Sequence, residues 1–173
     1  IGPLNLRQKS AIAIYGSEAT LAAVPQAFRY VSETVNPESS IPKLTLNEIG
    51  ESGVELFGLR FLPVPLEHGK SSIVYGYKFG QAGYLTDHSV IPQTCLERLH
   101  GLDVLFLDAL RHKPHPTHST VQQSLGYLRQ LSPRRAFFTH ISHDLPHGGT
   151  EEMLPPNVRL AYDGMSITVE DEQ

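Results

Sequence analysis

The chain has 173 residues, of which 40% are hydrophobic and 18% charged, so it is long enough to bury a substantial core within one domain. The formal net charge of −4 argues against a nucleic-acid partner, because proteins that neutralise phosphate backbones usually carry a basic surface. No run approaches the roughly 20 apolar residues of a membrane span, and Cys95 is the only cysteine, which excludes an internal disulfide and favours a cytoplasmic location.

The first half of the chain predicts mainly short strands. Ser17 supplies an N-cap for one helix, which runs toward Val31 and is interrupted or bent at Pro25. A polar loop is expected at residues 35–42, and Gly80-Gln81 is expected to join a hairpin. Alternation of apolar and polar side chains predicts strands at residues 10–15, 43–49, 54–57, 60–66, 73–79 and 82–86.

From residue 92 onward, helices and strands alternate. Helices are predicted at residues 92–99 and 119–131, and a loop with one helical turn at 146–157. Continuous apolar runs predict strands at residues 104–107 and 135–139, buried on both faces, and a final pair of strands is expected within residues 158–169. A meander of antiparallel strands followed by strand–helix–strand units predicts an α+β protein with helices on the outer faces of a mixed sheet.

All nine histidines lie at or after position 68, and several stand where a strand is expected to end. His68, Asp87 and His140 each end a separate strand, and imidazole and carboxylate are ligands of zinc and manganese. A carboxylate can bridge two cations, but an aspartate in a loop also commonly caps a turn. The spacing alone therefore leaves a metal site and ordinary hydrogen-bonded polar residues as equal alternatives.

His118 lies in a proline-rich loop just before a predicted helix, a position suited to a general acid or a donor to the transition state. Ser119 or Thr120 would be the N-cap of that helix. Asp108 ends another strand, and it either orients a ligand histidine or pairs with Arg111.

Other polar residues of this region are weaker candidates. His143 and Asp144 follow His140 closely and are candidates for supporting the ligands or contacting substrate. His88, His100 and His147 are expected to be exposed loop residues without a role. The sequence has no phosphate-binding Gly-x-x-x-x-Gly-Lys loop, no Gly-x-Ser-x-Gly elbow and no Cys-x-x-Cys pair.

Several stretches of the chain are similar to a known family. They resemble the metallo-β-lactamase superfamily and, within it, the PhnP-type phosphodiesterases, which open phosphoribosyl 1,2-cyclic phosphate in phosphonate breakdown. The opening residues 3–8 resemble the segment just after that family's first metal motif, so the resemblance covers essentially the whole chain, residues 1–173. The other stretches are residues 83–87, 101–111, 114–118, 139–145 and 160–165.

The resemblance implies an αββα four-layer sandwich with two divalent ions, zinc or manganese, at one edge of the paired sheets. Carried over by position, His68 would bind one ion, Asp87 would bridge both, and His140 would bind the other. His118 matches a histidine that is not a ligand and assists catalysis, as in the related ribonuclease Z. The implied reaction is attack of a metal-bridging hydroxide on phosphorus, with His118 donating to the leaving oxygen. A small phosphodiester substrate and a homodimer are implied in the same way.

The family's signature His-x-His-x-Asp-His, which supplies four ligands, has no counterpart in these residues. Because the chain opens where that motif would just have ended, we expect that an N-terminal part carrying it is missing. We therefore expect this chain alone to bind metal weakly and to be inactive, and its full-length parent to be a hydrolase. Phosphodiesterase activity of the 173 residues with added manganese would contradict that expectation.

Two other classes of function stay open. The first is another hydrolase of the same superfamily, such as a ribonuclease Z-like nuclease, a lactonase or a thioesterase. Residues 116–120, Pro-Thr-His-Ser-Thr, favour phosphodiester chemistry over the latter two, and the lack of basic charge argues against the nuclease. The second is a degenerate scaffold domain without catalysis, which would not need His68, Asp87, His118 and His140 in polar positions.

Overall fold

The computed structural model describes residues 2–29 and 42–170, which fall into two compact units divided after Gly53. The first unit pairs two short strands in parallel, and its connection between them is long enough for the crossover that parallel pairing requires. The expected strands near residues 10–15 and 43–49 are confirmed, but their parallel pairing departs from the predicted antiparallel meander. Its elements are α1 (Gly2–Gln8), which was not predicted, β1 (Ile12–Gly16), α2 (Glu18–Ala27) and β2 (Leu44–Glu48).

The predicted cap of α2 is confirmed, because the Ser17 hydroxyl accepts a hydrogen bond from the Thr20 backbone N–H at 3.2 Å. Pro25 lies inside the helix, which continues past it to Ala27 and has Phe28 as its C-cap, so the proline does not interrupt it. Residues 30 and 31 of the predicted continuation, and nearly all of the predicted loop at 35–42, lie outside the described residues.

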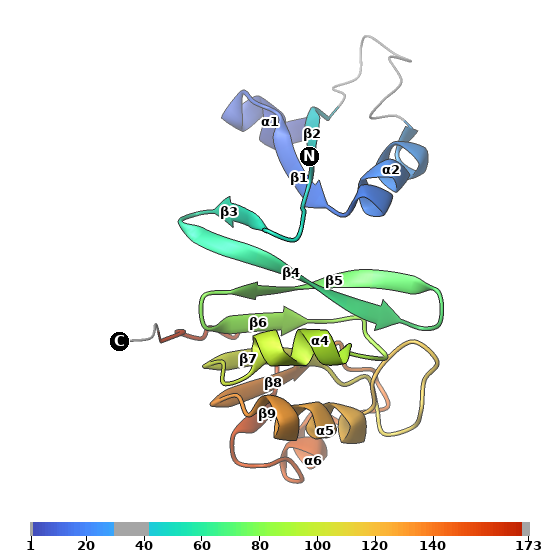
Figure 1. Ribbon diagram of the computed structural model, residues 1–173, viewed down its shortest axis with the longest axis vertical. Coiled ribbons are helices and arrows are strands. Elements are labelled where there is room, and N and C mark those ends of the chain that lie inside the picture. The colour runs from blue at the N-terminus through green and yellow to red at the C-terminus, as the bar shows by residue number, and fades with distance from the viewer. Residues whose placement is uncertain (1, 30–41, 171–173) are drawn as a thin grey trace. The chain divides into compact units, whose positions relative to one another are not determined.

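The second unit is built on one seven-stranded sheet in the order β3-β4-β5-β6-β7-β8-β9 (Figure 1). Neighbours are antiparallel from β3 to β6 and parallel from β6 to β9, which confirms the predicted change from a meander to strand–helix–strand units. The elements are β3 (Val54–Leu56), β4 (Leu59–His68), β5 (Ser72–Phe79), β6 (Ala82–Leu85), α4 (Gln93–Leu96), the 3-10 helix η1 (Glu97–Leu99), β7 (Val104–Asp108), α5 (Val121–Leu131), β8 (Arg135–Thr139), α6 (His147–Glu151) and β9 (Val158–Leu160).

Four strands of this sheet end at the same edge. Strands β4 and β6 both run antiparallel to β5, which lies between them, so they point in the same direction. Strands β7 and β8 are parallel to β6. The carboxyl ends of β4, β6, β7 and β8 therefore meet at one edge, which is the usual place of a ligand site in sheets with parallel strands.

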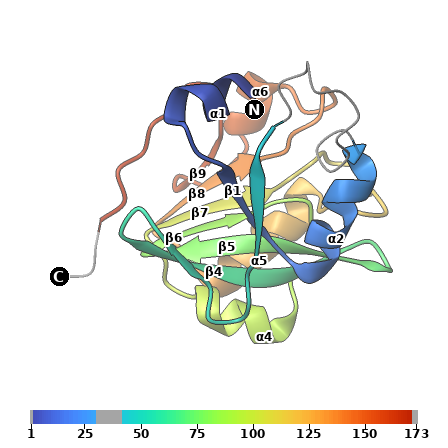
Figure 2. The ribbon, with the colours of Figure 1, turned by 90° about the horizontal axis from the view of Figure 1, so that it is seen from above.

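The hydrophobic core lies on one face of the sheet. The register aligns Leu85, Leu107 and Phe138 across β6, β7 and β8, and all three side chains are completely buried. Helices α4 and α5 lie against the same face in both views (Figures 1 and 2), and Leu128 and Leu131 of α5 join the buried cluster. The helices therefore cover one face of the sheet and leave the strand ends to the loops.

The opposite face of the sheet carries a row of aromatic rings from β6, β7 and β8. Tyr84 and Phe106 lie 5.5 Å apart between ring centroids, and Phe106 and Phe137 lie 5.4 Å apart. Apolar side chains on both faces explain why the strands at 104–107 and 135–139 read as continuous apolar runs, as is typical of parallel strands in layered folds.

The predicted final pair of strands is wrong in its second half. Strand β9 stops at Leu160, and Gly164 turns the chain with a φ of 84°. The following segment is held by side chains rather than by a neighbouring strand, since Arg135 donates to the Thr168 carbonyl and Asp103 accepts from the Glu170 N–H. Among the described residues, no helix combines the length and the apolar character needed to cross a membrane.

Asp103 is the centre of a small ionic network at the start of β7. Its carboxylate accepts hydrogen bonds from Arg134 Nε at 2.5 Å, Arg135 Nη2 at 2.8 Å and the Glu170 N–H at 2.8 Å. The Asp103 side chain is only 7% exposed. These donors hold the pKa of the Asp103 carboxyl well below its usual range, the bond from Arg134 being the largest cause.

We expect Asp103→Asn to lower the free energy of unfolding at pH 7 by roughly 1.5–3 kcal/mol, the usual contribution of hydrogen bonds to a charged group. A depressed folded pKa gives stability that is present above the unfolded pKa of 3.8 and is lost as the pH falls through the folded pKa. Urea unfolding of both proteins should therefore show a difference that is full at pH 7 and smaller at pH 3. An equal difference at both pH values would contradict this origin.

Candidate metal centre

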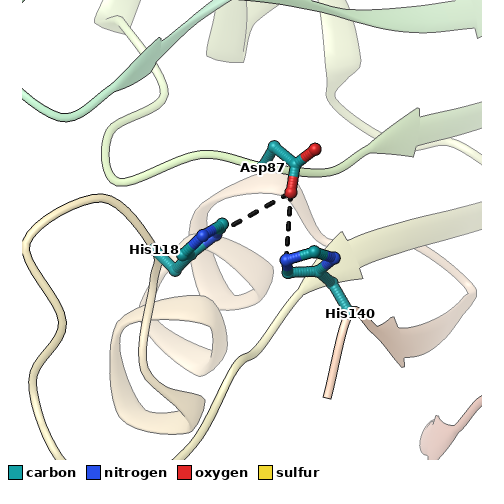
Figure 3. Close-up of side chains that lie close together, drawn as sticks. All are labelled: Asp87, His118 and His140. Atoms are coloured by element: carbon teal, nitrogen blue, oxygen red, sulfur yellow. Dashed lines mark ion pairs between the residues drawn. The ribbon is translucent and has the colours of Figure 1, made fainter. Parts of the chain in front are cut away.

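Three polar side chains converge at the edge where the strands end (Figure 3). Asp87 follows β6, His140 follows β8 directly, and His118 lies in the loop before α5. The candidate ligand atoms of these three residues all lie within 4.8 Å of one another. Asp87 Oδ1 is 3.0 Å from His140 Nε2 and 3.9 Å from His118 Nδ1, so the carboxylate stands between the two rings.

The backbone at two of these positions is in the left-handed region. Asp87 has a φ of 61° and His140 a φ of 55°. Residues other than glycine adopt this region uncommonly, although Asp, Asn and His do so more readily than most. Both residues occur just where a strand ends, so the sharp change of chain direction turns their side chains toward the sheet edge. Such strained conformations cluster at functional sites.

His68 is the last residue of β4 and joins this group through His118. The two Nε2 atoms are 3.5 Å apart, and the ring centroids are 4.9 Å apart. His68 is not within the cluster of three that the geometry selects as a possible ligand set. The structure thus brings together all four residues that the sequence pointed to, with His118 rather than His68 beside Asp87 and His140. Their division into three ligands and one catalyst stays a prediction.

Asp108, the last residue of β7, contacts His118 and not Arg111. Its Oδ2 lies 3.0 Å from His118 Nδ1 and accepts the His88 N–H at 3.1 Å, and its side chain is completely buried. Burial raises the pKa of the Asp108 carboxyl to about 7, against the opposing effects of His140 and of the His88 N–H. The Asp108 carbonyl accepts a hydrogen bond from the Ser124 hydroxyl of α5. Of the two predicted partners of Asp108, the structure thus shows a histidine and not Arg111, while its role in orienting a metal ligand stays a prediction.

The helix that follows His118 begins with the predicted cap. Thr120 accepts the Gln123 N–H, and the Gln123 side chain accepts the Thr120 N–H in return, which is a complete capping box. The cap gives the loop that carries His118 a defined end.

His143 and Asp144 lie farther along the surface, where Asp144 is 3.5 Å from both His143 and Arg111. No described contact joins either residue to the cluster, and their role stays a prediction.

His88 contradicts its prediction as an exposed residue. Its side chain is completely buried, with Nδ1 3.0 Å from the Ser119 hydroxyl and the ring edge-on to Tyr127. Burial lowers the pKa of the His88 imidazole to about 4, so the ring is neutral at pH 7. Its position in a polar loop gave no sign of burial. His100 and His147 are exposed, as predicted.

The residues present fit a divalent metal ion. An aspartate and two histidines, with a third histidine in contact, form the nitrogen and oxygen donor set that zinc and manganese prefer. Asp108 supports His118 from behind in the way that carboxylates commonly support histidines at metal sites. The side chains of Asp87 and His140 are 48% and 41% exposed, which leaves access from solvent.

The family of the chain follows from its sequence. Residues 2–141 match a family described as the beta-lactamase superfamily domain. The chain belongs to the metallo-β-lactamase superfamily. This confirms the predicted family and, with the mixed seven-stranded sheet, the predicted fold class. Members of the superfamily are metal-dependent hydrolases, and the cluster of Asp87, His118 and His140 is consistent with a divalent-metal site.

Three known proteins are similar to this chain. A diphosphatase from the PhnP family has a crystal structure that matches with 44% identity and a TM-score of 0.81, over 90% of this chain and 57% of that one. An octanoyltransferase of Porphyromonas gingivalis is 30% identical over 164 residues, which are 93% of this chain and 33% of that protein. Zinc-bound PqqB from Methylobacterium extorquens shares the fold, with 16% identity and a TM-score of 0.66, over 96% of this chain and 68% of that one.

The chain spans about a third of the length of the curated relative and little more than half of the length of the diphosphatase.

Proposed function

We propose that the protein is a metal-dependent phosphodiesterase that hydrolyses a small cyclic phosphodiester of the phosphoribosyl cyclic phosphate type. The observation that carries the proposal is the convergence of Asp87, His118 and His140, with His68 in contact, in a chain that is 44% identical to a PhnP-family diphosphatase. Diphosphatase activity of that relative supports chemistry at phosphorus. It also makes hydrolysis of a diphosphate linkage the second candidate.

The roles of the residues follow from their positions. Asp87 and His140, with His68, would hold the divalent ions, and Asp87 would bridge them, which is supported by its contact with His140. When bound, two such ions would offset charge on the phosphoryl oxygens and activate the attacking water between them. His118 Nδ1 is in contact with Asp108, so a proton for the leaving oxygen would come from its Nε2, which lies 3.5 Å from His68 Nε2.

The space beside His140 suits a small substrate. A cleft of about 360 Å³ is lined by Thr139, His140 and Ile141 on one side and by Ala161, Tyr162 and Asp163 on the other. This volume lies within the usual range for small-molecule sites, roughly 300–1,000 Å³. A small-molecule partner and a cytoplasmic location belong to the proposal, and the free, buried thiol of Cys95 fits a reducing compartment. A homodimer is part of it only through the family resemblance.

A substrate panel tests the proposal. The full-length protein would be assayed with manganese or zinc on a ribose cyclic phosphate, a nucleotide with a diphosphate linkage, an aryl phosphodiester, a lactone and a thioester. We expect the highest kcat/KM on the cyclic phosphate. A preference for the diphosphate would select the second candidate, and a preference for the lactone or thioester would overturn chemistry at phosphorus.

His118→Asn separates a catalytic role for His118 from a role as metal ligand. The asparagine amide can still donate to Asp108, but nothing remains at the position of Nε2. We expect kcat to fall by about 10²–10⁴-fold, as is usual for loss of a general acid, while zinc affinity stays near that of the unchanged protein. A large loss of zinc affinity in a chelator competition would show instead that His118 is a ligand.

A further inference from the structure

The imidazole of His88, in the second unit, is buried and has no role in the proposed chemistry. It lies directly after Asp87, is completely buried, and has its Nδ1 3.0 Å from the hydroxyl of Ser119. Ser119 in turn directly follows His118. The pair His88–Ser119 therefore connects the two loops that carry Asp87 and His118, one residue away from each of them.

Backbone hydrogen bonds reinforce this connection. The His88 carbonyl accepts the Ser119 N–H at 2.8 Å. The His88 N–H donates at 3.1 Å to Asp108 Oδ2, the same oxygen that lies 3.0 Å from His118 Nδ1. A displacement of His88 would therefore disturb Ser119, which follows His118 in the chain, and Asp108, whose carboxylate contacts the His118 ring.

The next residue extends the connection to the end of β4. The Ser89 hydroxyl accepts the Gly69 N–H at 3.0 Å and donates to the Glu67 carbonyl at 3.1 Å. Glu67 and Gly69 flank His68. Residues 88 and 89 thus tie together the three chain segments that present His68, Asp87 and His118.

The backbone at Asp87 explains why such an anchor is needed. Its φ of 61° is uncommon for a residue with a side chain and persists only where the surroundings enforce it. Asp87 itself is half exposed and makes its described side-chain contacts to His118 and His140 only. The completely buried ring of His88, the next residue in the chain, can hold the backbone of Asp87 in this conformation.

We propose that His88 is a positioning residue of the metal centre, whose Nδ1 bond to Ser119 holds the side chains of Asp87 and His118 in their mutual arrangement. It contacts neither metal nor substrate. The inference rests on the proposed function for the importance of that arrangement, but the arrangement itself can be tested without activity.

Two amide substitutions of His88 distinguish a role of its Nδ1 bond to Ser119 from a role of the ring's volume in packing. Asparagine at position 88 places its amide near the position of Nδ1 and keeps the contact to Ser119. Glutamine fills more of the ring's volume, but its amide lies near the position of Nε2, an atom with no described partner. Positioning predicts that His88→Asn is the milder change at the site, whereas packing predicts that His88→Gln is the milder change.

The first measurement is the zinc affinity of the full-length protein and its variants, determined by competition with a chromophoric chelator. We expect His88→Gln and Ser119→Ala to weaken zinc binding by about 10–100-fold, the usual effect of removing a group that supports ligands, and His88→Asn to weaken it much less. The double variant His88→Gln, Ser119→Ala should lose no more than either single one. Exposed His100 provides matched controls, His100→Asn and His100→Gln, which should change nothing.

The second measurement is hydrogen exchange of the Ser119 amide in the metal-free chain, compared with amides of β8. We expect the amide at position 119 to exchange faster in His88→Gln and in Ser119→Ala. In His88→Asn its exchange should change little. Equal effects of Asn and Gln in this measurement, or effects that follow the thermal stability of the variants, would overturn the proposal. If neither the unchanged full-length protein nor any of its variants binds zinc, the proposed function fails, while the exchange result still decides the role of His88.

Discussion

Asp87→Asn is expected to reduce zinc or manganese affinity by more than about 100-fold, because removal of a bridging ligand should exceed the 10–100-fold effect of removing a supporting group. Asp87 Oδ1 lies between His140 Nε2 and His118 Nδ1, so its negative charge is central to the cluster. Asparagine retains the shape of the side chain and tolerates the left-handed backbone at this position. The change should therefore remove the charge and leave the fold in place.

The measurement is again competition with a chromophoric chelator, together with circular dichroism to verify the fold. Glu55→Gln in β3 is the matched control, because it removes the same charge from an exposed position away from the cluster. Affinity in Asp87→Asn within a few-fold of the unchanged chain would remove Asp87 from the ligand set. In the full-length protein, the same variant should lose hydrolytic activity along with the metal.

The largest effect on stability is expected from Phe138→Ala, a loss of about 3–5 kcal/mol in the free energy of unfolding. Phe138 is completely buried in the centre of β8, within the cluster that joins the sheet to α4 and α5. Its removal exposes no new surface to solvent but leaves a cavity that rigid neighbours on three strands cannot fill. The loss should appear as a lower urea midpoint with an unchanged slope.

Phe57→Ala makes the same substitution in the turn between β3 and β4, where the ring is 97% exposed. We expect it to stay within about 0.5 kcal/mol of the unchanged chain, as is usual for surface positions. Similar losses for the two variants would show that Phe138 does not lie in the cooperative core.

Much of the second unit could be predicted from local pattern. The two continuous apolar runs at β7 and β8, the hairpin through Gly80-Gln81 and the helix before Leu131 are determined by short-range periodicity and turn chemistry, which act within a few residues. The failure at residues 161–169 has a physical cause. Alternating apolar residues there mimic a strand, but a strand also requires a neighbouring backbone, and side chains of Asp103 and Arg135 hold the segment instead.

The candidate site shows the same division. Residue type and position at strand ends identified His68, Asp87, His118 and His140 as chemically suitable, since a strand end can be read from periodicity. Which of them approach one another depends on strand order, on register and on the left-handed backbone at Asp87 and His140, none of which is a local property.

By itself, the sequence determined the family of this protein, the alternation of its helices and strands, and the kinds of side chain available for binding a metal. Only the tertiary structure decided that Asp87 faces His140 and His118, that Asp108 lies behind His118 and not beside Arg111, and that His88 is buried. The reason is that burial and contact depend on residues far apart in the chain. Asp108 and Ser119 lie 20 and 31 residues from His88, and they meet it only when β6 and β7 pair in parallel.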